Sequence, residues 1–307
     1  MFVGADVFPY TPSHSTGEFA MHAASAAVRI LADTTAGLPA EFVRAHPLEV
    51  VPQVILFGEE SLLEEKQISY PDFVRRLKAA SELPKTAAPP PGEYVQAFGR
   101  EIERARCLLV VAPSGDVSGT VRSALTAREE SFPTADIRVL DTRAVGGNLA
   151  TMVQLAVGWA EQGAGPEDIL ARLQAMIPRG RTYFLVTTLE YLRRGGRIGG
   201  ASALVGGALQ IKPILELKDG RVDVLEKVRT EAKALERLKE LVERDCPRGP
   251  EGHLCVMHAD DLQAAEALAL DLRARLGLAA IPIYTLGAAI TTHAGPGALG
   301  VGFFAAS

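Results

Sequence analysis

Hydroxyl and imidazole side chains follow several segments of this sequence that have the pattern of β-strands. They lie in four short polar stretches: Thr34-Thr35, Thr86, Ser118-Gly119-Thr120 and His293. In an open α/β sheet, ligands bind beyond the carboxyl ends of the strands, where helix N-terminal amides are also free. Hydroxyls and amides at such a place favour an anion, typically a carboxylate or a phosphate. Each stretch alone is equally typical of a helix cap or a turn, so only the set predicts an anion site.

Chemistry on such an anion needs residues that the sequence does not supply. No Walker lysine, metal-ligand cluster or paired-carboxylate motif accompanies the polar stretches. Ser118, Asp141 and His293 are the residue types of a hydrolase triad, but Ser118 lacks the GxSxG turn that exposes such a nucleophile. The sequence therefore favours binding over catalysis. An enzyme that acts on a small carboxylate or phosphate at the same loops is the alternative.

Three other patterns are weighed against simpler interpretations. His253, Cys255 and His258 would not converge from one strand face, so we expect no metal ion, and we expect no cofactor. Gly295–Gly300 matches GxGxxG, but only seven residues follow it, too few for a dinucleotide-binding unit. The basic turn 193–197 is typical of a helix end, where cations and glycine are favoured. Its arginines could equally hold an oxyanion through two hydrogen bonds.

Composition narrows the class of protein further. Of 307 residues, 48% are hydrophobic but only 6% aromatic, and the net charge is −5. These values exclude global disorder and argue against a nucleic-acid binder, which usually has a basic surface and stacking aromatics. The three cysteines have no CxxC spacing, which favours the reducing cytoplasm. Neither a secretory signal nor 18 continuous apolar residues occurs, so we expect a soluble protein without an integral membrane segment.

The elements that must position the polar loops alternate along the first half of the chain. The expected strands are Val28–Asp33, Glu49–Phe57, Cys107–Ala112 and Asp136–Asp141, with helices between them. This order predicts a Rossmann-like, doubly wound α/β domain over residues 28–163, after a disordered or loose extension over residues 1–27. An Asp219-Gly220 hairpin turn and flanking helices predict a smaller α+β domain over residues 164–307.

Taken in order, several segments resemble the DegV family of fatty-acid-binding proteins. They are LADTTAGLP (31–39), VVPQVILFGEE (50–60), LPKTAAPPPGEYVQAF (83–98), VSGTVRSA (117–124), VLDTRAVGGNLA (139–150), TLEYLRRGGRIGGASALVGGALQIKPILELKDGRV (188–222) and HAGPGALGVGF (293–303). The resemblance implies a ligand tunnel between the two domains that holds a long-chain fatty acid. It also implies a lipid-presenting subunit of bacterial fatty-acid kinase. A separate catalytic subunit would phosphorylate the bound carboxylate, giving an acyl phosphate for phospholipid synthesis.

The resemblance also implies site residues. Carboxylate contacts are expected from Thr86, Ala87, Ser118 and His293, and contacts with the ligand or the partner from Thr35, Gly119, Thr120 and Arg197. The loop that usually reads Thr-Ser-Gln-Pro in the family has alanine at its second and third positions here. A hydrogen bond to a charged group contributes about 1.5–3 kcal/mol, so we expect weaker or redirected head-group binding unless Thr86 or a backbone amide compensates.

Overall fold

The structure, a computed structural model, describes residues 26–204 and 211–306. Its first sheet is parallel, with the strand order β2-β1-β6-β7. These strands are β1 (Ala26–Asp33), β2 (Leu48–Val51), β6 (Ala105–Ala112) and β7 (Ile137–Asp141). The last six residues of β6 are all buried, as expected for a strand that is covered on both faces.

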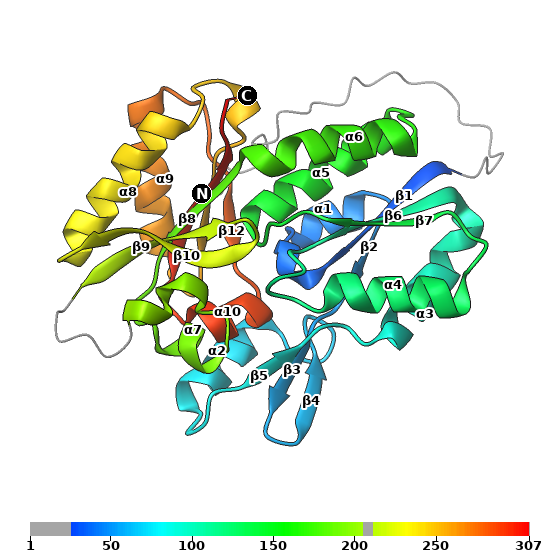
Figure 1. The fold of residues 1–307 in the computed structure, drawn as a ribbon, viewed down its shortest axis with the longest axis horizontal. Coiled ribbons are helices and arrows are strands. Elements are labelled where there is room, and N and C mark those ends of the chain that lie inside the picture. The colour runs from blue at the N-terminus through cyan, green and yellow to red at the C-terminus, as the bar shows by residue number, and fades with distance from the viewer. Residues whose placement is uncertain (1–25, 205–210, 307) are drawn as a thin grey trace.

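Helices cover both faces of this sheet (Figure 1). One face packs against α1 (Ala40–Ala45), α5 (Gly147–Glu161) and α6 (Pro166–Met176). The other packs against α3 (Pro91–Glu101) and α4 (Thr120–Ser131). The doubly wound α/β arrangement predicted from the sequence is therefore confirmed.

The start of β1 differs from the expectation. Ala26 pairs with Ala105, and Val28 with Cys107, on the neighbouring strand. Pairing with β6 thus extends the strand through two alanines, which have little intrinsic preference for strands. The extension expected over residues 1–27 is wrong at its last two positions, and its other residues lie outside the described part of the chain.

A second sheet of six strands has the order β10-β9-β8-β13-β11-β12. Its strands are β8 (Gly180–Leu185), β9 (Lys212–Lys218), β10 (Arg221–Val228), β11 (Cys255–His258), β12 (Ile283–Thr285) and β13 (Leu299–Phe304). One face packs against α8 (Glu231–Asp245) and α9 (Leu262–Leu276). The other face turns toward the first sheet (Figure 1).

The division between the two domains is less simple than expected. Helix α6 shares an apolar core with α5 and the first sheet, although it follows residue 163. The second sheet begins only at Gly180. A division after residue 163 stays a prediction, and the packing of α6 favours a place nearer Gly180.

The predicted hairpin between β9 and β10 is present. Asp219 and Gly220 have φ angles of 48° and 81°, the left-handed backbone that an Asp-Gly turn accommodates. The tip lies against the first domain, where the Ser114 hydroxyl donates to the Gly220 carbonyl at 2.8 Å. Arg221 also pairs with Asp116 at 2.6 Å. A Cβ on Gly220 would collide with Ser114, so glycine is needed for this approach.

A third, small sheet corrects one strand prediction. The segment Glu49–Phe57 was expected to be one strand, but it divides at Pro52-Gln53 into β2 and β3 (Val54–Phe57), which belong to different sheets. Proline lacks the N–H that a continuous ladder needs, so the chain changes direction there. The small sheet has the order β4-β3-β5, with β4 at Glu60–Leu63 and β5 at Lys85–Ala87.

The remaining helices lie between and around the sheets. They are α2 (Tyr70–Ala79), α7 (Glu190–Arg194) and α10 (Ala288–Ala294), with 3-10 turns at Thr34–Ala36, Ile102–Arg104, Ile177–Arg179, Gly199–Leu204 and Pro250–Gly252. Helix α10 contacts α7, α2, β3 and β5. Within residues 26–204 and 211–306, no helix is long and apolar enough to cross a membrane.

Candidate functional site

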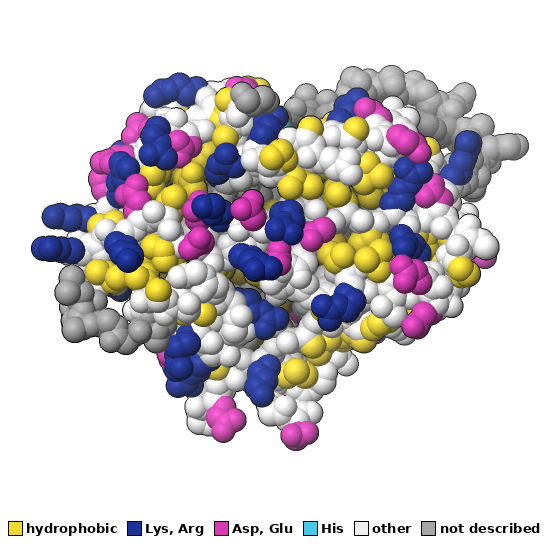
Figure 2. Space-filling view, in the orientation of Figure 1, with side chains coloured by type: hydrophobic (Ala, Val, Ile, Leu, Met, Phe, Trp, Pro, Cys, Tyr) yellow, Lys and Arg dark blue, Asp and Glu magenta, His cyan; other side chains and the backbone are white. Residues whose placement is uncertain are grey.

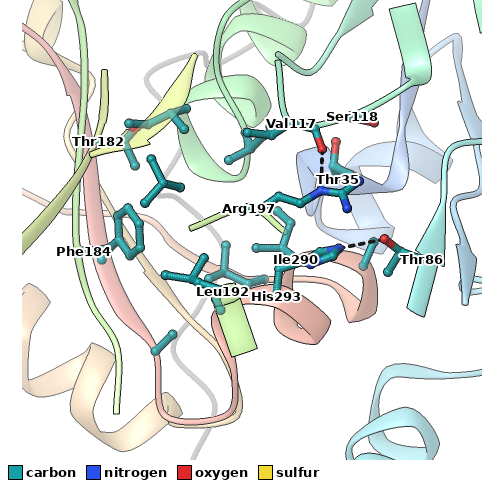
Figure 3. A pocket seen from close by; sticks show the side chains of 18 of the residues that line it. Thr35, Thr86, Val117, Ser118, Thr182, Phe184, Leu192, Arg197, Ile290 and His293 are labelled. Atoms are coloured by element: carbon teal, nitrogen blue, oxygen red, sulfur yellow. Dashed lines mark hydrogen bonds between the residues drawn. The ribbon is translucent and has the colours of Figure 1, made fainter. Parts of the chain in front are cut away.

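A cavity of about 1000 Å³, counted with the solvent at its mouth, lies between the two large sheets. Its lining comes from both halves of the chain, from Thr35 to Gly300. Figure 3 shows its two ends: Thr86, Ser118, Arg197 and His293 gather on one side, and Phe184 lies on the other. We call these the polar end and the apolar end.

The polar end is closed by β5 and α10. Thr86 Oγ1 and His293 Nε2 lie 2.7 Å apart, joining a strand of the small sheet to the last helix (Figure 3). Burial, together with the nearby charge of Arg197, lowers the pKa of His293 to about 4, so the imidazole is neutral near pH 7. Its Nδ1 atom is buried and has no hydrogen-bond partner among the described residues. A neutral ring beside a hydroxyl can orient that hydroxyl toward a ligand.

The first turn of α4 forms the second wall of the polar end. Ser118 Oγ accepts a hydrogen bond from the Thr120 amide at 3.3 Å, which holds the serine at the helix start. Ser118 and Gly119 both line the cavity. The partial positive charge of a helix N-terminus favours an anion at this place.

Arg197 brings a positive charge to the same end. Its Nε atom donates to the Val117 carbonyl at 3.1 Å, and Nη1 donates to the Gly195 carbonyl at 2.7 Å. No Asp or Glu among residues 26–204 and 211–306 forms an ion pair with it. The guanidinium therefore lines the cavity as a half-buried cation without an anionic partner.

The apolar end is formed by the inner face of the second sheet. Side chains alternate along β8, so Tyr183 packs under the outer helices while Thr182 and Phe184 face the cavity. Leu217 and Val222, paired across the β9–β10 hairpin, also line it. An elongated hydrocarbon group would fit this lining.

Most of the predicted site residues meet at this cavity. Those that line it are Thr35, Thr86, Ser118, Gly119, Arg197 and His293. Ala87 does not: strand alternation turns Thr86 inward and Ala87 to solvent, and Ala88 lines the cavity instead. Thr120 does not line it either, because its hydroxyl is buried and donates to Asp33 at 2.7 Å.

The suspected triad does not form. Asp141 accepts hydrogen bonds from the backbone amides of Gly115 and Arg143, at 3.2 and 2.9 Å. His293 bonds to Thr86 rather than to either of the other two candidates. The geometry gives Ser118 no imidazole base in hydrogen-bond contact.

Three buried polar residues were not predicted as part of the site. Asp33 and Gln53 form a hydrogen-bonded cluster with Thr120. Glu64 accepts from the Thr34 hydroxyl at 2.5 Å and from the Ala289 amide at 3.1 Å, which ties α10 to the first domain. Burial raises the pKa of Glu64 to about 7. The one sequence signal was a glutamine after Pro52, in an otherwise apolar run.

Comparison with known proteins places this architecture in a family. The model of the DegV family, described as uncharacterised, matches residues 27–306. The chain belongs to the DegV family. A DegV domain-containing protein of Streptomyces coelicolor is 37% identical over 277 residues, which cover 89% of this chain and 97% of that one.

Two solved DegV structures are similar over almost the whole chain. A DegV family protein from Thermus thermophilus, described as fatty acid binding, is 30% identical with a TM-score of 0.82. DegV of Bacillus subtilis, described as a fatty acid binding protein, is 31% identical with a TM-score of 0.81. The alignments cover 91% of this chain and 100% of each of the other two. The family resemblance inferred from the sequence motifs is therefore confirmed.

Proposed function

We propose that this DegV chain binds one long-chain fatty acid in the cavity and presents its carboxylate to a separate kinase subunit. The observation that supports this most is the pairing of an apolar lining with an unpaired cation at one end. A fatty acid has the same two parts, an alkyl chain and an anionic head. Two DegV relatives described as fatty acid binding add support.

The head group has several donors at the polar end. Arg197 offers an N–H beyond its two bonds to backbone carbonyls. Ser118 offers its hydroxyl beside the N-terminus of α4. With its ring proton on Nε2, His293 would donate to Thr86, which frees the Thr86 hydroxyl for the ligand. Hydrogen bonds from these groups to a carboxylate are the charge-assisted kind, about twice as strong as neutral ones.

The loss of polar side chains at positions 87 and 88 is compatible with this proposal. Ala87 faces solvent, so a hydroxyl there would not reach the cavity. Ala88 lines the cavity beside Gln53, whose amide lies in the same polar cluster. Thr86 still lines the cavity. Head-group binding thus rests on Thr86, Ser118, Arg197 and His293.

The proposed role is that of a carrier rather than a catalyst. The cavity residues include no nucleophile paired with a base in the described part of the chain. Figure 2 shows Lys and Arg side chains around the middle of one face, near the junction of the two domains, with Asp and Glu side chains among them. Three buried free cysteines suit the cytoplasm, where a kinase subunit would be met.

The test of lipid binding is native mass spectrometry of the purified protein, before and after denaturation. We expect a co-purifying acid of about the mass of a C14–C18 fatty acid. Ser118→Ala should lower its retention by about tenfold or more, since a hydrogen bond to a charged group contributes about 1.5–3 kcal/mol. Ser131→Ala, at the other end of α4, is the matched control. Equal retention in both variants would contradict the head-group assignment.

The test of presentation is acyl-phosphate formation in a reconstituted assay with a fatty-acid kinase catalytic subunit. Arg197→Ala should reduce turnover more than fatty-acid retention, because two of its N–H groups hold backbone carbonyls rather than the ligand. Arg194→Ala, an exposed residue of the same turn that pairs with Glu190, should leave turnover unchanged. Unchanged turnover in both variants would remove the role of Arg197.

The alternative function is an enzyme that acts on a small carboxylate or phosphate at the polar end. The strand-end hydroxyls and the cation support it, but such a substrate would leave the apolar end empty. Mass spectrometry separates the two functions. A small polar ligand that turns over without a partner protein would favour the enzyme, and a retained fatty acid favours the carrier.

A further inference from the structure

A carboxyl group lies directly behind the polar end of the cavity and has no cation beside it. Asp33 has no solvent-accessible surface. No lysine or arginine among the described residues forms an ion pair or a hydrogen bond with it, and burial raises its pKa. Removing an ionised carboxylate from water without a counter-ion is costly, so such a group either collects hydrogen bonds or takes up a proton.

Both carboxylate oxygens of Asp33 accept hydrogen bonds. Oδ1 accepts from the amide of Thr35, at 2.9 Å, and from the Thr35 hydroxyl. Oδ2 accepts from the Gln53 amide at 2.6 Å and from the Thr120 hydroxyl at 2.7 Å. With four donors, Asp33 can exist as an anion in the empty protein. The hydroxyl protons of Thr35 and Thr120 are then both committed to it.

Thr35 lines the cavity itself, and the Thr120 hydroxyl connects to the cavity through Ser118. Ser118 Oγ lies 2.9 Å from Thr120 Oγ1. Since a hydroxyl has one proton and Thr120 gives its own to Asp33, Ser118 must be the donor in this contact. Ser118 lines the cavity. The hydroxyls of Ser118 and Thr120 therefore form a chain of hydrogen bonds from the cavity wall to the buried carboxylate of Asp33.

We propose that Asp33 and the fatty-acid head group hold one proton between them, passed through Ser118 and Thr120. This inference rests on the proposed function, because it needs the head group beside Ser118. An uncharged fatty acid gives its proton to Ser118, Ser118 passes its own to Thr120, and Thr120 passes its own to Asp33. The products are a fatty-acid carboxylate and a neutral Asp33, and no other reactant is needed.

The ionised head group is the form that a kinase requires, because a carboxylate oxygen is the nucleophile toward a phosphoryl group. A ligand that enters already as an anion reaches the same end state. The anionic head group and the Asp33 carboxylate, joined by the same two hydroxyls, repel each other. Asp33 then takes up a proton from solvent. Asp33 does not line the cavity and acts on the ligand through other residues, here Thr120 and Ser118, so it is a positioning residue.

Other titratable groups lie around these hydroxyls, and proton uptake by them must be distinguished from proton uptake by Asp33. Tyr94, from α3, feels the charge of Asp33, and burial raises its pKa, so it stays neutral. His293, across the cavity, has a pKa lowered to about 4 and is neutral as well. Arg197 is a fixed cation at the cavity wall. Glu64, which senses the charge of Asp33 and whose pKa is raised to about 7, is the rival for the proton among these described groups.

The test measures protons taken up when palmitate, delivered as its anion from cyclodextrin, binds to the full chain. Calorimetry in buffers of different protonation enthalpy gives this number between pH 6 and 9. The wild type is expected to take up more than half a proton per palmitate at its maximum. Asp33→Asn should still bind palmitate but take up less than a fifth of a proton. Glu64→Gln, the matched control, should keep the uptake of the wild type.

A second variant guards against misfolding of Asp33→Asn. Thr120→Val keeps the shape of the side chain but removes the hydroxyl link, and it should lower proton uptake to less than half that of the wild type. Palmitate binding by the wild type without proton uptake overturns the inference and leaves the proposed function intact. Uptake that survives in Asp33→Asn but disappears in Glu64→Gln also overturns it. No palmitate binding by the wild type would instead defeat the proposed function.

Discussion

The two ends of the cavity are built from different kinds of segment. The polar end is assembled from separate elements: Thr86 lies in the short strand β5, Ser118 just before α4, and His293 in the last turn of α10. The apolar end is the inner face of one sheet, where neighbouring strands fix the side chains. Under the proposed function, binding at the polar end would depend on which atoms carry protons, whereas binding at the apolar end would depend on volume. The effects of substitutions at the two ends should therefore differ both in the property that changes and in the size of the change.

The largest effect is expected from filling the apolar end. Leu217→Trp places extra volume where the end of an alkyl chain would lie. If it displaces about four methylenes, each contributing about 0.8 kcal/mol, palmitate binding weakens by about 3 kcal/mol, or more than 100-fold. Decanoate, which is shorter, should lose less than tenfold.

Calorimetric titration with both acids measures this difference. Lys218→Trp, at an exposed neighbouring position, is the control and should bind both acids as the wild type does. Equal losses for decanoate and palmitate would show that the apolar end does not sense chain length.

A comparable effect, on stability rather than on binding, is expected behind the polar end. The folded-state pKa of Glu64, about 7, lies above its ordinary value of 4.5, so folding favours the protonated form. The stabilising contribution is full below pH 4.5 and is lost as the pH rises through 7. It amounts to about 3 kcal/mol of unfolding free energy.

Glu64→Gln should remove this loss, because glutamine keeps both hydrogen-bonding positions and does not ionise. Urea unfolding at pH 5 and pH 8.5 compares the variant with the wild type, and the variant should gain much more stability relative to it at the higher pH. Leu217→Trp, at the other end, should follow the pH dependence of the wild type. A constant difference between Glu64→Gln and the wild type at both pH values would disprove this origin.

The smallest effect is expected at the position where the sequence first suggested a large one. Ala87→Ser restores a hydroxyl that the family resemblance implied, but position 87 is exposed and outside the cavity. Stability and fatty-acid affinity should change by no more than about 0.5 kcal/mol, the usual range for surface substitutions. Competition binding of a fluorescent fatty acid measures the affinity, and a tenfold gain would return Ala87 to the site.

The sequence predicted the polar loops well because their chemistry is local. Ser118 lies between a buried strand and the start of a helix, and both patterns are visible in a few residues. The direction of a side chain is harder to predict. Ala87 was placed in the site by the family resemblance, but β5 has only three residues, and its inward face is fixed by pairing with β3, about thirty residues away along the chain.

The residues behind the site could not be predicted for a related reason. Asp33 was placed at the end of the expected strand Val28–Asp33, but nothing in the local sequence shows that four donors converge on its carboxylate. One of those donors, Gln53, lies where the chain leaves one sheet for another. A glutamine in a predicted strand gives no sign of such a partner, since the contact depends on a bend that Pro52 imposes.

The position of α10 near the end of the chain determines when the cavity becomes complete during synthesis. His293 and the helix that carries it complete a cavity whose other wall starts at Thr35, so the two sides leave the ribosome far apart in time. The first sheet can fold on its own helices while the chain is still growing. An emerging chain would nevertheless have no closed place for a lipid until its last helix has been synthesised. Lipid capture would then be among the final steps of maturation, and a chain that stops before α10 could fold in part and still carry nothing.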